Sequence, residues 1–186
     1  MKGAPSSGEQ SAEQNEPADS SHSFHFEFAK STHDYMQEYI RLADQKSAFV
    51  FGASTAGLAL LYQSSKPHAW LGLPGNWRVN NLLALSAMIA LACAVALAIT
   101  VVKPRRKGPR FGLIFWDAVV ERSSGNEYAT NVIESSGNEL LTEYLRHTYD
   151  LAKVCRAKYD WLHYSFLAFL IGLVLAAVYF SWFAPL

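Results

Sequence analysis

Hydrophobic residues are concentrated in three segments that contain no Asp, Glu, Lys or Arg, at 47–65, 79–102 and 161–186. About 20 helical residues span the bilayer's hydrocarbon core of roughly 30 Å, so each segment is long enough to cross it. Trp161, Tyr164, Tyr179 and Trp182 lie near the ends of the third segment, as in an aromatic belt. The pattern predicts transmembrane helices at 47–65, 79–102 and 161–183.

The first of these segments is the most polar, because it contains Gly52, Ser54, Thr55 and Gly57. Small residues of this kind favour close contact between helices. A buried helix of a soluble protein is the alternative interpretation, but the length and the lack of charge favour a span. Three spans alone do not enclose a wide pore, so we expect a homo-oligomer, with Gly52, Ser54 and Gly57 as a candidate contact face.

The basic residues predict the orientation of these spans. Only Lys66 and Arg78, of the 16 Lys and Arg residues, lie in the loop 66–78 between the first two segments. Because segments rich in Lys and Arg stay in the cytoplasm, we expect a cytoplasmic N-terminus and a periplasmic loop 66–78. Residues 103–160 are then cytoplasmic and the C-terminus is periplasmic.

The N-terminal 46 residues divide into two parts. Residues 1–23 have no aromatic and no branched aliphatic side chain, which predicts a disordered leader. In residues 24–46 the apolar positions recur at steps of three and four, which predicts a cytoplasmic amphipathic helix that continues into the first span. Its stripe comprises Phe28, Thr32, Tyr35, Met36, Tyr39, Ile40 and Ala43.

The segment 103–160 carries two patterns. The pentapeptide Ser-Ser-Gly-Asn-Glu occurs at 123–127 and again at 135–139, and in each copy we expect the Gly to end one helix and the Asn to cap the next. From Leu141 onward the apolar positions alternate at steps of four and three, as in a packed or coiled-coil seam. They are Leu141, Leu145, Thr148, Ala152, Cys155, Tyr159 and Leu162.

Together these patterns predict an all-α membrane protein with three transmembrane helices. Its cytoplasmic helical bundle is expected to form from extensions of the first and third spans plus residues 103–160. The 16 basic and 16 acidic residues balance, so no net field attracts nucleic acid as a partner. Cys93 and Cys155 have neither disulfide nor metal-ligand spacing, and the six histidines are scattered along the chain. The sequence has no Gly-rich phosphate loop and no His-Glu-x-x-His, Gly-x-Ser-x-Gly or Cys-x-x-Cys motif. We therefore expect neither an enzyme nor a cofactor.

Several short motifs, in their order relative to the spans, resemble the transmembrane effectors of Pycsar antiphage systems (the PycTM family). They are Asp44-Gln45-Lys46-Ser47-Ala48, Pro104, Phe111…Ile114-Phe115-Trp116, Glu127-Tyr128 and Tyr149-Asp150…Lys158-Tyr159…Tyr164-Ser165-Phe166. The resemblance covers roughly residues 30–180, and Trp116 departs from it, since a second Phe is expected there.

The resemblance implies a function that composition does not give. A partner cyclase makes a cyclic pyrimidine mononucleotide, cUMP or cCMP, when phage infects the cell. The effector binds this nucleotide through its cytoplasmic part and impairs the inner membrane, which causes abortive infection.

Such a ligand needs a cation or a helix N-terminus for its phosphate and an aromatic face for its base. The candidate ligand-binding residues are Asp44, Lys46, Arg105, Arg110, Phe115, Trp116, Tyr128, Asp150, Lys158 and Tyr159.

Each group has a structural alternative. The basic run 103–107 is also explained as a topology determinant, and Phe115 and Trp116 as core residues. The charged residues Asp44, Lys46, Asp150, Lys153 and Lys158 are also explained as an ion-pair network between span extensions. Helix starts at Asn126 and Asn138 offer phosphate sites, but simple capping explains them as well.

Two other functions fit the same patterns. A structural or scaffolding membrane protein would use the cytoplasmic seam to recruit a partner. A small ion channel without a nucleotide ligand would have no need of the aromatic and acidic residues in 111–160.

Overall fold

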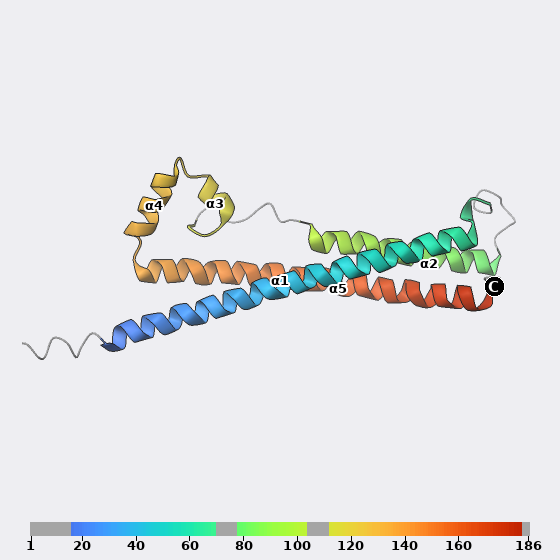
Figure 1. Ribbon diagram of the computed structural model, residues 1–186, viewed down its shortest axis with the longest axis horizontal. Helices are drawn as coiled ribbons and strands as arrows, with labels where there is room; N and C mark the ends of the chain where they lie inside the picture. The colour runs from blue at the N-terminus through green and yellow to red at the C-terminus, as the bar shows by residue number, and fades with distance from the viewer. Residues whose placement is uncertain (1–15, 70–77, 104–111, 184–186) are drawn as a thin grey trace, which may run out of the picture. The chain divides into compact units, whose positions relative to one another are not determined.

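The computed structural model describes residues 16–69, 78–103 and 112–183. These residues form α1 (Glu16–Ser65), the 3₁₀ turn η1 (Pro67–Ala69), α2 (Val79–Val102), α3 (Trp116–Val120), α4 (Gly125–Glu134) and α5 (Gly137–Trp182) (Figure 1). No strand occurs in this described part, so the all-α class is confirmed for it. The chain divides into a first unit, Met1–Gln37 with Arg106–Ala152, and a second unit, Glu38–Arg105 with Lys153–Leu186.

The helices α1 and α5 each contribute to both units. Helix α1 begins at Glu16, before the predicted boundary at residue 24, and continues without a break to Ser65. Helix α5 starts at Gly137 and also runs unbroken to Trp182. The predicted continuity of both long helices is thus confirmed, while residues 1–15 and most of the loop 66–78 lie outside the described residues.

In the second unit, parts of α1, α2 and α5 pack side by side (Figure 1). Buried positions recur at alternating steps of three and four on all three helices, which is the heptad spacing of knobs-into-holes packing. On α2 they are Ala84, Ala87, Leu91, Ala94, Ala98 and Val101. The seam predicted along α5 is confirmed at Thr148, Cys155 and Leu162 and continues to Tyr179, whereas Leu145 is 45% exposed and lies off it.

Small and polar side chains form much of the interior of this unit. The Ser47 hydroxyl donates a hydrogen bond to the Ala98 carbonyl at 2.8 Å, and the Ser165 hydroxyl donates to the Ala94 carbonyl at 2.9 Å. Ser54 is fully buried, and its hydroxyl has no hydrogen-bond partner among the described residues. Such residues allow close approach of helix backbones in a membrane.

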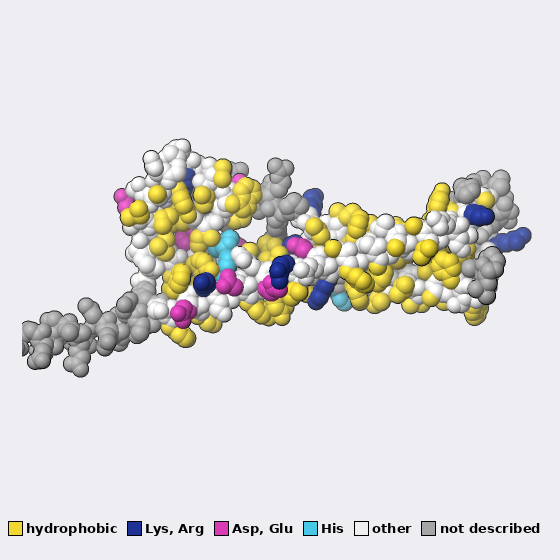
Figure 2. All heavy atoms as spheres, viewed as in Figure 1, with side chains coloured by type: hydrophobic (Ala, Val, Ile, Leu, Met, Phe, Trp, Pro, Cys, Tyr) yellow, Lys and Arg dark blue, Asp and Glu magenta, His cyan; other side chains and the backbone are white. Residues whose placement is uncertain are grey.

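The outer surface of the same unit is apolar. Phe49 is 65% exposed, Leu60 59% and Ile171 50%, and hydrophobic side chains cover much of the visible face over α2 and its neighbours (Figure 2). An exposed apolar surface around a small-residue interior is the arrangement expected in lipid rather than in water. Both α2 and α5 are long and apolar enough to cross a membrane, so two of the three predicted spans are supported by length and composition.

The predicted association face at Gly52, Ser54 and Gly57 is not one face of α1. Ser54 is buried, and a Cβ on Gly57 would lie 3.0 Å from the Leu91 side chain of α2. Gly52 has no neighbour within 4 Å. Residues two apart point to nearly opposite sides of a helix, so Ser54 and Gly57 serve packing within the chain.

The stripe predicted on the N-terminal part of α1 is also corrected. Phe28 is 63% exposed and Tyr35 53%, whereas Ala29, His33 and Ala43 are the buried residues between 24 and 46. Of the predicted stripe, only Ala43 is buried. The buried side of the helix therefore carries the smaller residues, and the larger aromatic rings stay outside.

The repeated pentapeptides cap α4 and α5 in a different register from the predicted one. Ser124 is the N-cap of α4, and its side chain accepts a hydrogen bond from the Glu127 amide. At α5, the Ser136 hydroxyl accepts from the Glu139 amide while the Glu139 carboxylate accepts from the Ser136 amide at 2.7 Å. The second Ser of each copy is thus the cap, and at α5 the two reciprocal bonds form a capping box.

Candidate functional site

A groove of about 270 Å³ lies in the first unit, beside the N-terminal part of α5. The backbone before α3 forms one wall of this groove. Gly112 has a φ of 133°, a conformation that favours glycine, and a Cβ there would lie 2.9 Å from the Glu143 carboxylate. The groove is lined by Gly112, Ile114, Phe115, Glu143, Arg146, His147 and Asp150.

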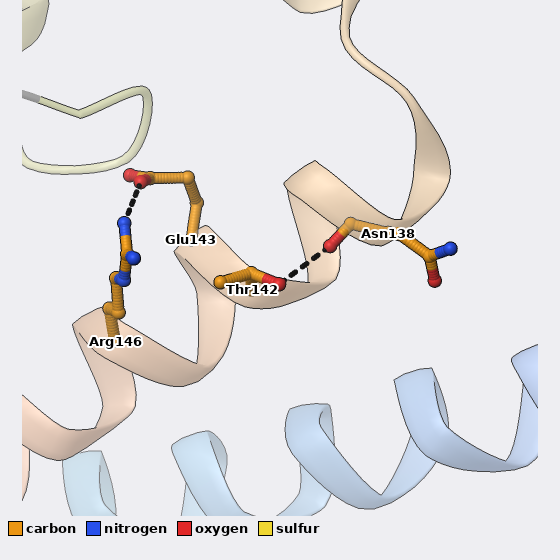
Figure 3. A network of polar contacts seen from close by, with 4 residues as sticks. All are labelled: Asn138, Thr142, Glu143 and Arg146. Atoms are coloured by element: carbon orange, nitrogen blue, oxygen red, sulfur yellow. Dashed lines mark hydrogen bonds and ion pairs between the residues drawn. The ribbon is translucent and has the colours of Figure 1, made fainter.

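The charges of this groove come from successive turns of α5. Arg146 donates to the Glu143 carboxylate at 3.3 Å, one turn earlier on the same helix (Figure 3). In the preceding turn the Thr142 hydroxyl donates to the Asn138 carbonyl (Figure 3). The Arg146 side chain is 74% exposed, and an exposed pair of this kind contributes only about 0.2–1 kcal/mol. The guanidinium is therefore available to an incoming anion at little cost.

His147 connects this groove to α1. Its ring centroid lies 5.3 Å from that of His33, and the His33 ring lies 4.9 Å from that of Tyr144. His33 is only 8% exposed, and its Nε2 lies 2.8 Å from the Gln37 side-chain nitrogen. Among the described residues, His33 Nδ1 has no hydrogen-bond partner.

Burial lowers the pKa of His147, and the nearby His33 lowers it further, whereas Asp150 acts in the opposite direction. Burial also raises the pKa of Tyr144, and the Asp34 charge adds to that rise. Both shifts favour neutral side chains in the contact between α1 and α5 within this unit.

The predicted ligand residues in the first unit have different surroundings. Phe115 and Asp150 line the groove. Trp116 is 56% exposed, with its ring 5.7 Å from that of Phe115. The Tyr128 hydroxyl donates to the Leu113 carbonyl at 3.0 Å, so Tyr128 holds α4 against the segment before α3.

Four other predicted residues belong to the second unit. Asp44 and Lys158 form an ion pair between α1 and α5, as the structural alternative predicts. The Lys46 ammonium lies 5.8 Å from the centre of the Tyr159 ring, within cation–π range. Arg105 and Arg110 lie outside the described residues.

The prediction from sequence missed His33, Tyr144, Arg146 and His147. The six histidines are scattered along the sequence, whereas the structure brings His33 and His147 together. A signal was present in the sequence, since His33 lies four residues after Ala29 and three before Met36, which places it on the same helix face as these apolar residues.

Comparison with known proteins gives two matches. The family model described as "Pycsar effector protein domain" matches residues 28–184. The Pycsar effector protein SaPycTM of Staphylococcus aureus is 28% identical over 148 residues, which cover 78% of this chain and 88% of that protein. No solved structure matches the chain. Because the family match covers the groove and both apolar helices, this chain belongs to the Pycsar effector (PycTM) family.

Proposed function

We propose that this protein is an antiphage effector of the bacterial inner membrane. It binds a cyclic pyrimidine mononucleotide, cUMP or cCMP, made by a partner cyclase, and it then impairs the membrane and causes abortive infection. Family membership supports the role in a Pycsar system, and the apolar α2 and α5 support the membrane as the target. The role requires binding and a change of packing, so no catalytic step is assigned to the chain.

The groove beside α5 is the nucleotide site in this proposal. The observation that carries it is the meeting of a cation, an aromatic ring and carboxylates around one opening, at Arg146, Phe115, Glu143 and Asp150. Arg146 pairs with the cyclic phosphate and Phe115 stacks on the pyrimidine. A carboxylate of Glu143 or Asp150 accepts a hydrogen bond from the ribose hydroxyl or a base amine.

Through the His147–His33 contact, ligand binding changes the packing of α1. A nucleotide that pulls Arg146 away from Glu143 changes the surroundings of His147, which packs against His33. Ligand shifts an equilibrium only by its preference for one of two arrangements. Here these are two packings of α1 against α5 in the first unit, and both helices continue into the second.

A third span at 47–65 completes the proposed topology. Ser47 and Ser54 are fully buried, while Phe49, Phe51 and Leu60 on the same helix are exposed. This distribution of buried polar and exposed apolar residues supports a lipid environment for this part of α1. The N-terminus and residues 103–160 are then cytoplasmic, the loop 66–78 and the C-terminus are periplasmic, and the effector works as a homo-oligomer.

Calorimetry on the full-length protein in detergent tests the binding step. We expect cUMP or cCMP to bind and cAMP not to bind. Arg146→Gln should weaken binding by about tenfold or more, the loss expected for a charge-assisted hydrogen bond. Arg122→Gln, in the same unit but outside the groove lining, should bind like the parent protein. Absence of binding to every cyclic mononucleotide would refute the proposal.

Dye entry into cells tests the membrane step. Permeabilisation is expected only when the protein is expressed with a cyclase that supplies its nucleotide.

A scaffolding protein remains the second candidate, supported by exposed apolar residues of the first unit. Phe24 is 66% exposed, Phe28 63% and Ile133 82%, and such residues suit a protein partner. Intact membranes with either nucleotide, together with confirmed expression, would favour this function.

A further inference from the structure

A second groove, of about 510 Å³, lies in the second unit between α1 and α5. It is separate from the groove proposed for the nucleotide and shares no residue with it. Its lining residues are Lys46 and Phe49 of α1 and Tyr159, Leu162, His163 and Phe166 of α5.

The polarity of this groove changes along its length. On α1, Lys46 directly precedes the charge-free segment 47–65, and Phe49 lies one turn inside it. On α5, Tyr159 precedes the charge-free segment that begins at Trp161, and Phe166 lies inside it. The groove therefore has a polar end at the boundary of the apolar segments and an aromatic end within them. Phe49 is 65% exposed and Phe166 45%, so the apolar end is open to the surrounding medium.

The polar end carries a positive charge that no described carboxylate neutralises. The neighbouring Asp44 is already paired with Lys158. In the described ranges Lys46 forms no ion pair, and its ammonium lies over the Tyr159 ring. A ligand that complements this groove has an anionic head and an apolar chain.

We propose that this groove binds an anionic phospholipid. The lipid phosphate pairs with Lys46, with the Tyr159 hydroxyl and His163 as hydrogen-bond donors, and an acyl chain lies along Phe49 and Phe166. Basic pockets between membrane helices bind acidic lipid head groups in this way. The lipid fills the α1–α5 contact of the second unit and so becomes part of that packing. This inference does not depend on nucleotide binding.

Native mass spectrometry of the full-length protein tests this assignment. The probes are phosphatidylglycerol and phosphatidylcholine with identical acyl chains. The parent protein should retain more phosphatidylglycerol than phosphatidylcholine. Lys46→Gln should reduce this retention about fivefold, the effect of one basic residue near an anionic lipid, whereas Lys46→Arg should keep it. Lys30→Gln, an exposed lysine of the first unit on the same helix, is the matched control. Equal retention of the two lipids by the parent protein, or equal losses in Lys46→Gln and Lys30→Gln, would overturn the proposal.

A competition experiment separates a lipid from other phosphates. Inorganic phosphate and cUMP or cCMP should leave bound phosphatidylglycerol in place. Displacement of the lipid by a free nucleotide, with loss of nucleotide binding in Lys46→Gln, would overturn the lipid assignment and give the groove to the nucleotide. Tyr159→Phe, which keeps the ring under Lys46, should retain most of the lipid preference, and Tyr159→Leu should not.

Discussion

Gly172 of α5 lies so close to Leu91 of α2 that a Cβ at position 172 would be 2.7 Å from the leucine side chain and 3.1 Å from its backbone nitrogen. Leu91 also meets Gly57 of α1, where a Cβ would lie 3.0 Å from its Cδ1 atom. One leucine of α2 thus fits between two glycines of the other long helices. Because a backbone atom is among the neighbours of Gly172, this contact has little room to relax.

We predict that Gly172→Ala destabilises the protein. The added methyl group overpacks the α2–α5 contact, and such changes cost about 1–3 kcal/mol. Gly57→Ala should cost less, because only the end of a side chain has to move. Gly52→Ala is the matched control, since Gly52 has no neighbour within 4 Å and Ala favours helix by up to about 1 kcal/mol. Thermal unfolding in detergent, followed by size-exclusion chromatography, measures the relative stabilities of the three variants. A Gly172→Ala protein as stable as Gly52→Ala would contradict the prediction.

The long helices could be predicted from the sequence. Apolar spacing, charge-free length and the absence of breakers are local properties, and α1, α2 and α5 follow them. The heptad series of α5 was also predicted at Thr148, Cys155 and Leu162. Its continuation to Tyr179 was hidden because almost every residue there is apolar, so hydrophobicity no longer marks the packed side.

The candidate site could be predicted less well from the sequence, for two physical reasons. Hydrophobicity suggested that the aromatic residues of α1 face inward, whereas a close helix contact selects Ala29 and His33 and leaves Phe28 outside. The pairing of His33 with His147 joins positions far apart in the chain, which no local pattern specifies. An ion-pair network between the span extensions was predicted as an alternative, but the sequence does not specify that Asp44 pairs with Lys158.

The second prediction concerns the serine that caps α4. Ser124→Ala should destabilise the start of α4 by about 1 kcal/mol, because the Glu127 amide loses its acceptor. Asn126→Ala should have almost no effect, although sequence reasoning placed the cap there. Hydrogen exchange of the α4 amides reports the difference, and the opposite order of the two variants would restore the cap to Asn126.

The His147–His33 contact should make the first unit sensitive to acid. Since burial lowers the pKa of His147 in the folded protein, the unfolded chain takes up the proton first as pH falls through the ordinary value of about 6.5. The stabilisation by neutral His147 is therefore complete above that pH and is lost below it, down to the folded pKa. The His147 ring contacts His33, which in turn contacts Tyr144, and Asp150, Glu143 and Arg146 line the groove with His147. Of these, Asp150 favours protonation.

Thermal unfolding between about pH 5 and 8 measures this loss. His147→Gln should flatten the pH dependence of the unfolding temperature. His25→Gln, at an exposed histidine of α1, should leave it unchanged. An identical pH profile in His147→Gln and the parent protein would assign the acid sensitivity to other groups.

The number of spans decides on which side of the membrane the C-terminus lies. If α1, α2 and α5 all cross, the N- and C-termini lie on opposite sides; if only α2 and α5 cross, they lie on the same side. We expect three crossings, because α1 buries Ser47 and Ser54 and exposes Phe49 and Leu60, which favours a lipid environment. Alkaline phosphatase fused after Leu186 should then be active, and the same enzyme fused before Met1 should be inactive. Equal activity of the two fusions would mean that 47–65 does not cross, and α1 would then lie on one side of the bilayer along its whole length.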